Sequence, residues 1–256
     1  MLKMIGRKII RAIEIFRLYR NWWYPFFAYF HLIRHPEVTY TLRKGTKFTC
    51  AIKDMEAIPA INDVWFRKIY TPGRINIKNA KIVIDIGAHI GSFSVFAALN
   101  SSPDVKVYSY EPSPVNYKFL IQNIKHNGLN NIKAFQLAIS GEKGKVRLYM
   151  DEKRSTFNST TIQKGYPVEV DAITLQNILD DNAINNCDLL KMDCEGAEYE
   201  ILLGAQKSDL SRIRNIALEY HDVQSCHIDD LKKHLEKHGY DVEFGPIPIL
   251  YAWRRK

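Results

Sequence analysis

From residue 81 onward, short apolar runs alternate with segments whose apolar positions recur at helical spacing. The runs predict strands at 81–86, 105–111, 132–138, 145–150, 167–171, 188–193 and 213–219. Helices are expected between them at 91–99, from Ser113-Pro114 to Gly128, from Thr174, at 196–206 and at 228–238. Strands near 240–245 and 248–254 close the chain, and 151–166 reads as loop. This alternation predicts an α/β fold with a mostly parallel sheet, helices on both faces and a C-terminal antiparallel hairpin.

The N-terminal residues follow a different pattern. Residues 4–20 place apolar side chains among regularly spaced arginines, which predicts an amphipathic helix. The aromatic run at 21–33 is too short to span a bilayer, and Pro25 interrupts it. Together these features predict a basic helical extension ahead of the main domain.

A boundary follows this extension. Two strand-like runs lie near 38–42 and 46–52, and Asp54 caps a predicted helix that reaches about Tyr70. The run Thr71-Pro72-Gly73 then separates the two parts. We therefore expect an N-terminal extension at 1–71 and a ligand-binding domain at 72–256.

Charge and cysteine usage add a cellular context. Residues 1–48 hold ten lysines and arginines against two acids, whereas the remaining 26 basic and 26 acidic residues cancel. The net charge of +8 thus belongs to the N-terminal segment. Four cysteines without a CxxC pair, and no secretory signal ahead of them, indicate a cytoplasmic protein with reduced thiols and no zinc site.

The basic segment also carries the cluster Trp22-Trp23-Tyr24, a combination typical of an interfacial anchor. We therefore consider a peripheral contact with the inner membrane face through residues 1–34. The alternative is that these aromatic residues pack against the catalytic domain or a second subunit, or close over a cofactor.

The stretch VIDIGAHIGSF, residues 83–93, predicts a buried strand that runs into a helix through a glycine turn. It is neither a GxxxxGK[ST] loop nor a GxGxxG fingerprint, because Ala88 and His89 follow the first glycine. Asp85 ahead of that glycine suits a cationic ligand. The next strand ends in Glu111, which can accept both hydroxyls of a ribose. An adenosine ligand without phosphate, S-adenosylmethionine, fits these features; the alternative is a tight turn that binds nothing.

Several stretches resemble the FkbM family of S-adenosylmethionine-dependent methyltransferases. They occur in the family's order over roughly residues 72–222, as DIGAHIG, YSYEPSPVNYKFLIQNIKHNG, LAISGEKG, VDAITLQNIL, CDLLKMDCEGAE and IALEYHD. The resemblance implies a class I methyltransferase (Rossmann-like) fold and, usually, methylation of a hydroxyl on a sugar or natural product. It assigns the cofactor to Asp85, Gly87, Ala88, Gly91, Glu111, Ala138 and Ile139. It also assigns an acidic cluster to Asp193, Glu195 and Glu198.

Side-chain alternation in strands brings two candidate pairs to the same sheet edge, Lys191 with Asp193 and Glu219 with His221. An unperturbed histidine titrates near neutrality, so His221 suits a general base, although it could be a surface residue. Asp193 could act as a base, bind a substrate hydroxyl or ligate a cation. Lys191 is a third catalytic candidate, or simply neutralises the acids.

A metal ion is a further possibility at this edge. Asp193 with Glu219 resembles the paired acids of metal-dependent macrolide-sugar methyltransferases, where oxygen ligands suit Mg²⁺. The same carboxylates could instead bind sugar hydroxyls. Glu195 and Glu198 could equally be first-turn acids of a helix, and His89 a turn residue near the cofactor.

The prediction is thus an O-methyltransferase that acts on a hydroxyl of a small molecule, sugar or glycan. The alternatives are a methyltransferase for a nitrogen, lipid or protein acceptor, and a non-catalytic cofactor-binding module. A nicotinamide dehydrogenase fails at the glycine turn. No nucleic-acid partner is expected, because MDCEGAE stands where amino-methylating enzymes commonly carry Asn/Asp-Pro-Pro-aromatic.

Overall fold

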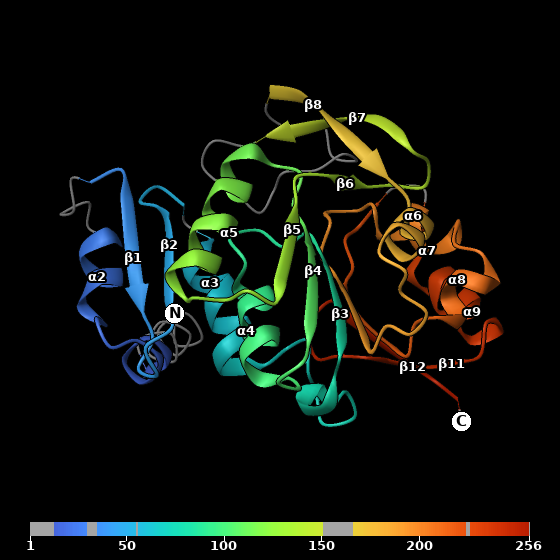
Figure 1. Ribbon diagram of the computed structural model, residues 1–256, viewed down its shortest axis with the longest axis horizontal. Helices are drawn as coiled ribbons and strands as arrows, with labels where there is room; N and C mark the ends of the chain where they lie inside the picture. The colour runs from blue at the N-terminus through green and yellow to red at the C-terminus, as the bar shows by residue number, and fades with distance from the viewer. Residues whose placement is uncertain (1–12, 30–34, 55, 151–165, 224–225, 256) are drawn as a thin grey trace, which may run out of the picture.

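The computed structural model describes residues 13–29, 35–54, 56–150, 166–223 and 226–255 (Figure 1). Its centre is a seven-stranded sheet in the order β11-β12-β10-β9-β3-β4-β5. The strands are β3 (Ile82–Ile86), β4 (Lys106–Tyr110), β5 (Ile132–Phe135), β9 (Leu189–Met192), β10 (Asn215–Glu219), β11 (Tyr240–Phe244) and β12 (Ile249–Arg254). Only β12 pairs antiparallel, with β10 and with β11. The predicted parallel sheet and closing hairpin are confirmed.

Strand order reverses at β3, which pairs with β4 on one side and with β9 on the other. The chain runs outward from β3 through β4 to β5 and then returns to β9 and β10 on the opposite side. In open α/β sheets, the crevice beyond the carboxyl ends of the strands at such a reversal is where ligands bind. The fold therefore places the candidate site beyond β3, β4 and β9.

Helices cover both faces of the sheet (Figure 1). One face carries α4 (Ser92–Asn100) and α5 (Pro114–His126), and the other carries α6 (Leu175–Asp181), α7 (Glu198–Leu203), α8 (Lys207–Ser211) and α9 (Ile228–Lys237). Alternation along β3 produces this sandwich, because Val83 packs into one core cluster and Ile84 and Ile86 into the other.

Two predicted elements differ in the structure. The strand predicted at 132–138 ends with β5, and β6 (Ala138–Ile139) joins a separate three-stranded sheet with β8 (Tyr166–Ile173) and β7 (Gly144–Met150). The helix predicted at 196–206 is shortened to α7, because Glu195 and Gly196 ahead of it have positive φ and Gly204 follows its last residue; α8 is a separate helix beyond the predicted range. Residues 151–165 of the predicted loop lie outside the described residues, and Tyr166 already belongs to β8.

The N-terminal part contains more structure than a helical extension. Residues 13–18 are helical, and α2 (Trp23–Tyr29) follows; the remainder of the helix predicted at 4–20 and residues 30–34 lie outside the described residues. β1 (Glu37–Thr41) and β2 (Lys47–Ala51) form the expected strand pair. The helix predicted after Asp54 is α3 (Ala57–Asn62), continued by a π-helical turn (Asp63–Arg67), and a 3₁₀ turn (Ile77–Asn79) leads to β3.

Two asparagines of α5 attach the β1–β2 hairpin to the main sheet layer. The amide of Asn123 accepts a hydrogen bond from the Thr49 N–H (2.6 Å) and donates one to the Thr49 carbonyl (3.0 Å). One helical turn later, Asn127 makes the same pair of bonds with Lys47 (2.9 and 2.8 Å). These amides satisfy the edge of β2 as a neighbouring strand would.

The hydrophobic core also crosses the boundary predicted at residues 71–72. Tyr19 and Phe48 belong to the same buried cluster as Val83 and Phe93. The core is therefore continuous across the predicted boundary. Among the described residues, no helix is long and apolar enough to cross a membrane.

Candidate active site

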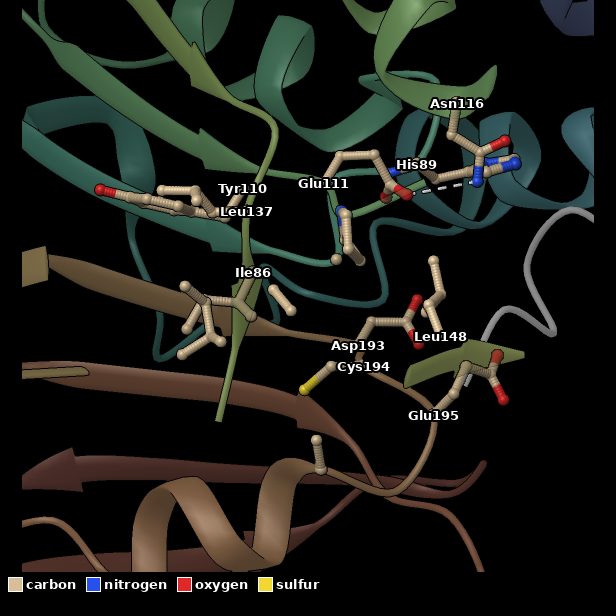
Figure 2. A pocket seen from close by; sticks show the side chains of 15 residues that line it. Ile86, His89, Tyr110, Glu111, Asn116, Leu137, Leu148, Asp193, Cys194 and Glu195 are labelled. Carbon is tan, nitrogen blue, oxygen red and sulfur yellow. Dashed lines mark hydrogen bonds between the residues drawn. The ribbon is translucent and has the colours of Figure 1, made fainter. Parts of the chain in front are cut away.

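A pocket lies at the carboxyl ends of β3, β4 and β9 (Figure 2). Its empty volume, counted out into the solvent at its open mouth, is about 570 Å³. The lining comes from the glycine turn, the end of β4, the segment around β6 and the start of the loop after β9. The lining residues are Ile86, Gly87, His89, Tyr110, Glu111, Pro112, Asn116, Leu137, Ala138, Ile139, Leu148, Asp193, Cys194, Glu195 and Ala197.

The glycine turn is fixed by backbone contacts on two sides. The N–H groups of Gly87 and Ala88 both donate to the carbonyl of Tyr110 at 3.0 Å. Gly87 has a φ of +73°, and a Cβ atom there would overlap the backbone carbonyl of Asp193. Only glycine therefore allows the turn after β3 to pack against the end of β9.

The Asp85 carboxylate lies behind this turn and does not line the pocket. Asp85 and Lys191 are register partners on β3 and β9, and the Lys191 Nζ lies 3.0 Å from the Asp85 Oδ1. Lys191 also donates to the Gly87 carbonyl at 2.7 Å. Both side chains are buried, and their ion pair supports the turn from behind.

Glu111 ends β4 with its carboxylate at the pocket wall (Figure 2). One oxygen accepts the His89 N–H at 2.7 Å, and the other accepts the Ser113 N–H at 2.9 Å and the Asn116 amide at 3.4 Å. Burial raises the pKa of Glu111, although His89 and these donors oppose the shift. The oxygen that accepts the His89 N–H keeps a further lone pair, so the fixed carboxylate can still accept a ribose hydroxyl.

His89 is held from the N-terminal part of the chain. Its Nε2 lies 3.4 Å from the Asp54 carboxylate, and its backbone is left-handed (φ 52°). Burial would lower the pKa of His89, but the hydrogen bond and charge of Asp54, with Glu111 and Asp193, raise it. Four non-glycine residues among the described ones have positive φ, and two of them, His89 and Glu195, line this pocket. Strained backbone is common at functional sites.

Four acidic side chains surround the imidazole of His221 and face the glycine turn. We call this group the acidic wall; it consists of Asp193, Glu195, Glu198 and Glu219. The Nδ1 of His221 lies 3.2 Å from Glu198, and its Nε2 lies 3.5 Å from Glu195 and 4.0 Å from Asp193. Glu198 is fully buried and also accepts the N–H groups of Cys194 and Gly196, both at 2.8 Å. Glu198 is thus a first-turn acid that also orients the imidazole.

The close spacing of these charged groups shifts the pKa values of three of them, His221, Glu195 and Glu219. Burial alone would lower the pKa of His221, but Glu198, followed by Glu195 and Asp193, raises it to about 10. Burial and repulsion from neighbouring carboxylates raise the pKa of Glu195 to about 8 and that of Glu219 to about 7. Only an unperturbed histidine titrates near neutrality, and this raised pKa makes the His221 side chain less suited to accept a proton than the sequence alone suggests.

Tyr70 joins two of these carboxylates from outside the sheet. Its hydroxyl lies 3.1 Å from the Asp193 Oδ2 and 3.2 Å from the Glu219 Oε2. The predicted metal pair of Asp193 and Glu219 is therefore bridged by a tyrosine. Asp193, Glu195 and His221 instead present ligand atoms within 4.8 Å of one another, a spacing that could hold a cation.

The structure thus divides the predicted site residues. Gly87, Glu111, Ala138, Ile139 and Asp193 line the pocket, whereas Asp85, Ala88, Gly91, Lys191, Glu219 and His221 are not among its lining residues. Sequence reasoning did not place Tyr70, Asp54, Asn116 or Leu148 at the site. It used Asp54 only as a helix cap, whereas the N-cap residue of α3 is Glu56. Tyr70 and Asp54 carry no local signal, because both lie far from the motifs in sequence and reach the site only through tertiary packing.

The chain is similar in sequence to known methyltransferases. A model of the methyltransferase FkbM domain matches residues 85–242. The chain is 26% identical over 247 residues to the 31-O-demethyl-FK506 methyltransferase FkbM of Streptomyces tacrolimicus, which covers 84% of this chain and 94% of that protein. It is 25% identical over 160 residues to the 2-O-methyltransferase NoeI of Sinorhizobium fredii, which covers 56% of this chain and 64% of that protein. Among solved structures, M. jannaschii TYW2 in complex with AdoMet has a TM-score of 0.45 and 17% identity, over 86% of this chain and 84% of that one.

Proposed function

We propose, from the premise that this chain belongs to the methyltransferase FkbM family, that it methylates a hydroxyl group of a small molecule, sugar or glycan. The chain is an S-adenosylmethionine-dependent methyltransferase. The choice of a hydroxyl acceptor is supported by the acidic wall beside the pocket. Two relatives carry names that specify methylation at oxygen, 31-O and 2-O.

The residues present fit the methyl donor. Glu111 offers a fixed carboxylate for the ribose hydroxyls, and the apolar side chains of Leu137, Ile139 and Leu148 flank the space for the adenine. When bound, S-adenosylmethionine supplies an electrophilic methyl group on a sulfonium. The carboxylate of Asp193 at the far wall favours that cationic centre in place of the buried Asp85.

Asp193 is the group that we assign to the acceptor hydroxyl. Methyl transfer depends mainly on alignment, and the hydroxyl must lose its proton as the new bond forms. Asp193 lines the pocket, whereas His221 does not and is already protonated at neutral pH. In this assignment, Asp193 accepts the proton. The positively charged His221, held by Glu198, offsets the repulsion between Asp193 and the neighbouring carboxylates and so keeps Asp193 in place.

The acidic wall also bears on the competing acceptors. A wall of carboxylates repels nucleic-acid phosphates, and residues 49–256 carry no net positive charge to attract them. Sugar hydroxyls, in contrast, donate readily to carboxylates. Methyl uptake from labelled S-adenosylmethionine by a panel of sugars, polyols, amines and RNA tests the proposal directly.

A divalent cation is a separate proposal at the same wall. Asp193, Glu195 and His221 would hold it, and His221 would have to lose the proton on its Nε2 to do so, while its Nδ1 stays oriented by Glu198. Two carboxylates and an imidazole suit Mg²⁺ only in part, because Mg²⁺ prefers oxygen ligands throughout. Exhaustive treatment with EDTA, followed by repletion with Mg²⁺, distinguishes a required cation from a metal-free reaction.

We also propose that the enzyme works in the cytoplasm and contacts anionic lipid at the inner membrane face through residues 1–34. Among the described residues, six of the thirteen exposed large hydrophobic side chains fall within residues 13–27. They form what we call the aromatic face, which consists of Ile13, Phe16, Trp22, Trp23, Tyr24 and Phe27. Exposed Arg17 and Arg20 lie among them, and this pairing of aromatic and basic side chains suits a lipid headgroup layer.

The opposite side of the same segment is built into the fold. Tyr19 is fully buried and donates to Asn62, and the buried carboxylate of Glu14 pairs with Arg67 at 3.0 Å. Arg43 donates to the Phe16 carbonyl and stacks on the Phe16 ring. One face of this segment therefore packs against the rest of the protein, and we assign the membrane contact to the other, the aromatic face.

A further inference from the structure

Tyr70 reaches the candidate site from a part of the chain that precedes the matched family domain at 85–242. Its side chain is buried, with its ring edge-on to Phe93 at 5.5 Å and the Lys191 ammonium 5.3 Å from its centroid. The backbone just ahead of it is also held, because the Tyr251 hydroxyl of β12 donates to the Ile69 carbonyl at 2.6 Å. Tyr70 therefore enters the site as a rigid group.

The Tyr70 hydroxyl acts there as a donor. Burial raises the pKa of Tyr70 well above its ordinary value, and repulsion from Asp193 and Glu219 adds to the shift. Both atoms within hydrogen-bond distance of this hydroxyl are carboxylate oxygens, of Asp193 and Glu219, so its one hydrogen points toward them.

The contacts of Asp193 divide between its two oxygens. Oδ2 lies 3.1 Å from the Tyr70 hydroxyl and 4.0 Å from the Lys191 ammonium. Oδ1 lies 4.0 Å from the His221 Nε2, beyond hydrogen-bond distance. The hydrogen bond from Tyr70 thus engages Oδ2, and Oδ1 is the oxygen left for a substrate hydroxyl.

We propose that Tyr70 is a positioning residue for methyl transfer: its hydroxyl holds the Asp193 Oδ2 beside Glu219 so that Oδ1 faces the acceptor. This inference rests on the proposed function, in which Asp193 receives the acceptor's proton. If so, Tyr70, which precedes the matched family domain, contributes to the part of the site that binds the methyl acceptor. A carboxylate free to rotate would present Oδ1 only part of the time, and the alignment that the reaction needs would be lost.

The test compares Tyr70→Phe with Tyr251→Phe in the full-length protein. Both variants remove one phenolic hydroxyl that anchors the same segment, but only Tyr70 touches the site carboxylates. With an acceptor taken from the panel, Tyr70→Phe should lower kcat at least tenfold while the KM for S-adenosylmethionine stays within twofold. Tyr251→Phe should lower the melting temperature without changing kcat.

Crystal structures of both variants with S-adenosylhomocysteine provide a readout that needs no acceptor. The proposal expects the Asp193 carboxylate to turn away from Glu219 in Tyr70→Phe and to keep its orientation in Tyr251→Phe. An unmoved carboxylate in Tyr70→Phe, an unchanged kcat, or an equal loss of kcat in both variants would overturn it. If the parent enzyme methylates no hydroxyl, the proposed function fails, and the crystal structures still decide whether Tyr70 positions Asp193.

Discussion

Glu111 is the residue on which the cofactor assignment depends most. Glu111→Ala removes the acceptor for the ribose hydroxyls, and losing charge-assisted hydrogen bonds costs about 1.5–3 kcal/mol, or roughly tenfold to a hundredfold in affinity. Calorimetry with S-adenosylhomocysteine should show this loss. Glu219→Gln serves as the control, because Glu219 does not line the pocket and its variant should bind normally. Parental affinity in Glu111→Ala would refute the ribose assignment, provided that melting curves show the variant folded.

His221 makes a prediction about stability and pH. Its pKa rises from 6.5 to about 10 in the folded protein, so the folded state holds an extra proton between these values. The stabilisation from this cation is complete below the lower pKa and disappears as pH rises through the higher one. Urea unfolding should therefore show His221→Gln much less stable than the parent at about pH 6, with the difference shrinking toward about pH 10. A difference independent of pH would contradict the raised pKa.

At the scale of elements, the sequence predicted the order of strands and helices because each buried strand ends in a turn or helix cap that is local in sequence. Ser113 caps α5, and Thr174 with Asn177 forms a capping box for α6. Elements whose limits depend on distant partners were predicted less well. β6 is a separate strand because it pairs with β8, and no residue near Ala138 in the sequence indicates this pairing.

The same distinction applies to the site. Gly87 and Glu111 could be predicted, since a glycine turn after one strand and an acid at the end of the next are local patterns. The pairing of Asp85 with Lys191 depends on the register between β3 and β9. These strands are far apart in the sequence, since Lys191 and the Gly87 that it also contacts are separated by 104 residues. Tyr70 and Asp54 require the docking of the N-terminal part, which two asparagines of α5 secure.

At the scale of the whole molecule, the two faces of the N-terminal segment lead to a prediction about membranes. Substituting exposed residues of the aromatic face, as in Trp22→Ser with Trp23→Ser, should leave the fold intact because neither ring is buried. The parent should sediment with vesicles that contain anionic phosphatidylglycerol and be released by salt, since each basic residue near such a surface contributes about 1 kcal/mol. The double variant should bind less well, and Leu99→Ser, exposed on α4, should bind as the parent does.

Other outcomes would count against a membrane contact. A parent protein that ignores anionic vesicles contradicts it, and so does equal binding by the parent and the double variant. If the tryptophan substitutions instead convert a dimer into a monomer, a second copy of the chain covers the aromatic face. Removal of residues 1–34 is a poor substitute for these variants, because the buried Tyr19 and Glu14 would be lost with it and the fold would be destabilised.

The central claim is that the acidic wall delivers a methyl group to a hydroxyl oxygen. The most direct measurement is methyl transfer from ¹³C-methyl-labelled S-adenosylmethionine to a panel of sugars, polyols and amines, with NMR to identify the atom that receives the label. We predict an O-methyl product with the parent enzyme. With Asp193→Asn, we predict that turnover is lost while S-adenosylhomocysteine still binds. Label on nitrogen, or undiminished turnover in Asp193→Asn, would contradict the account.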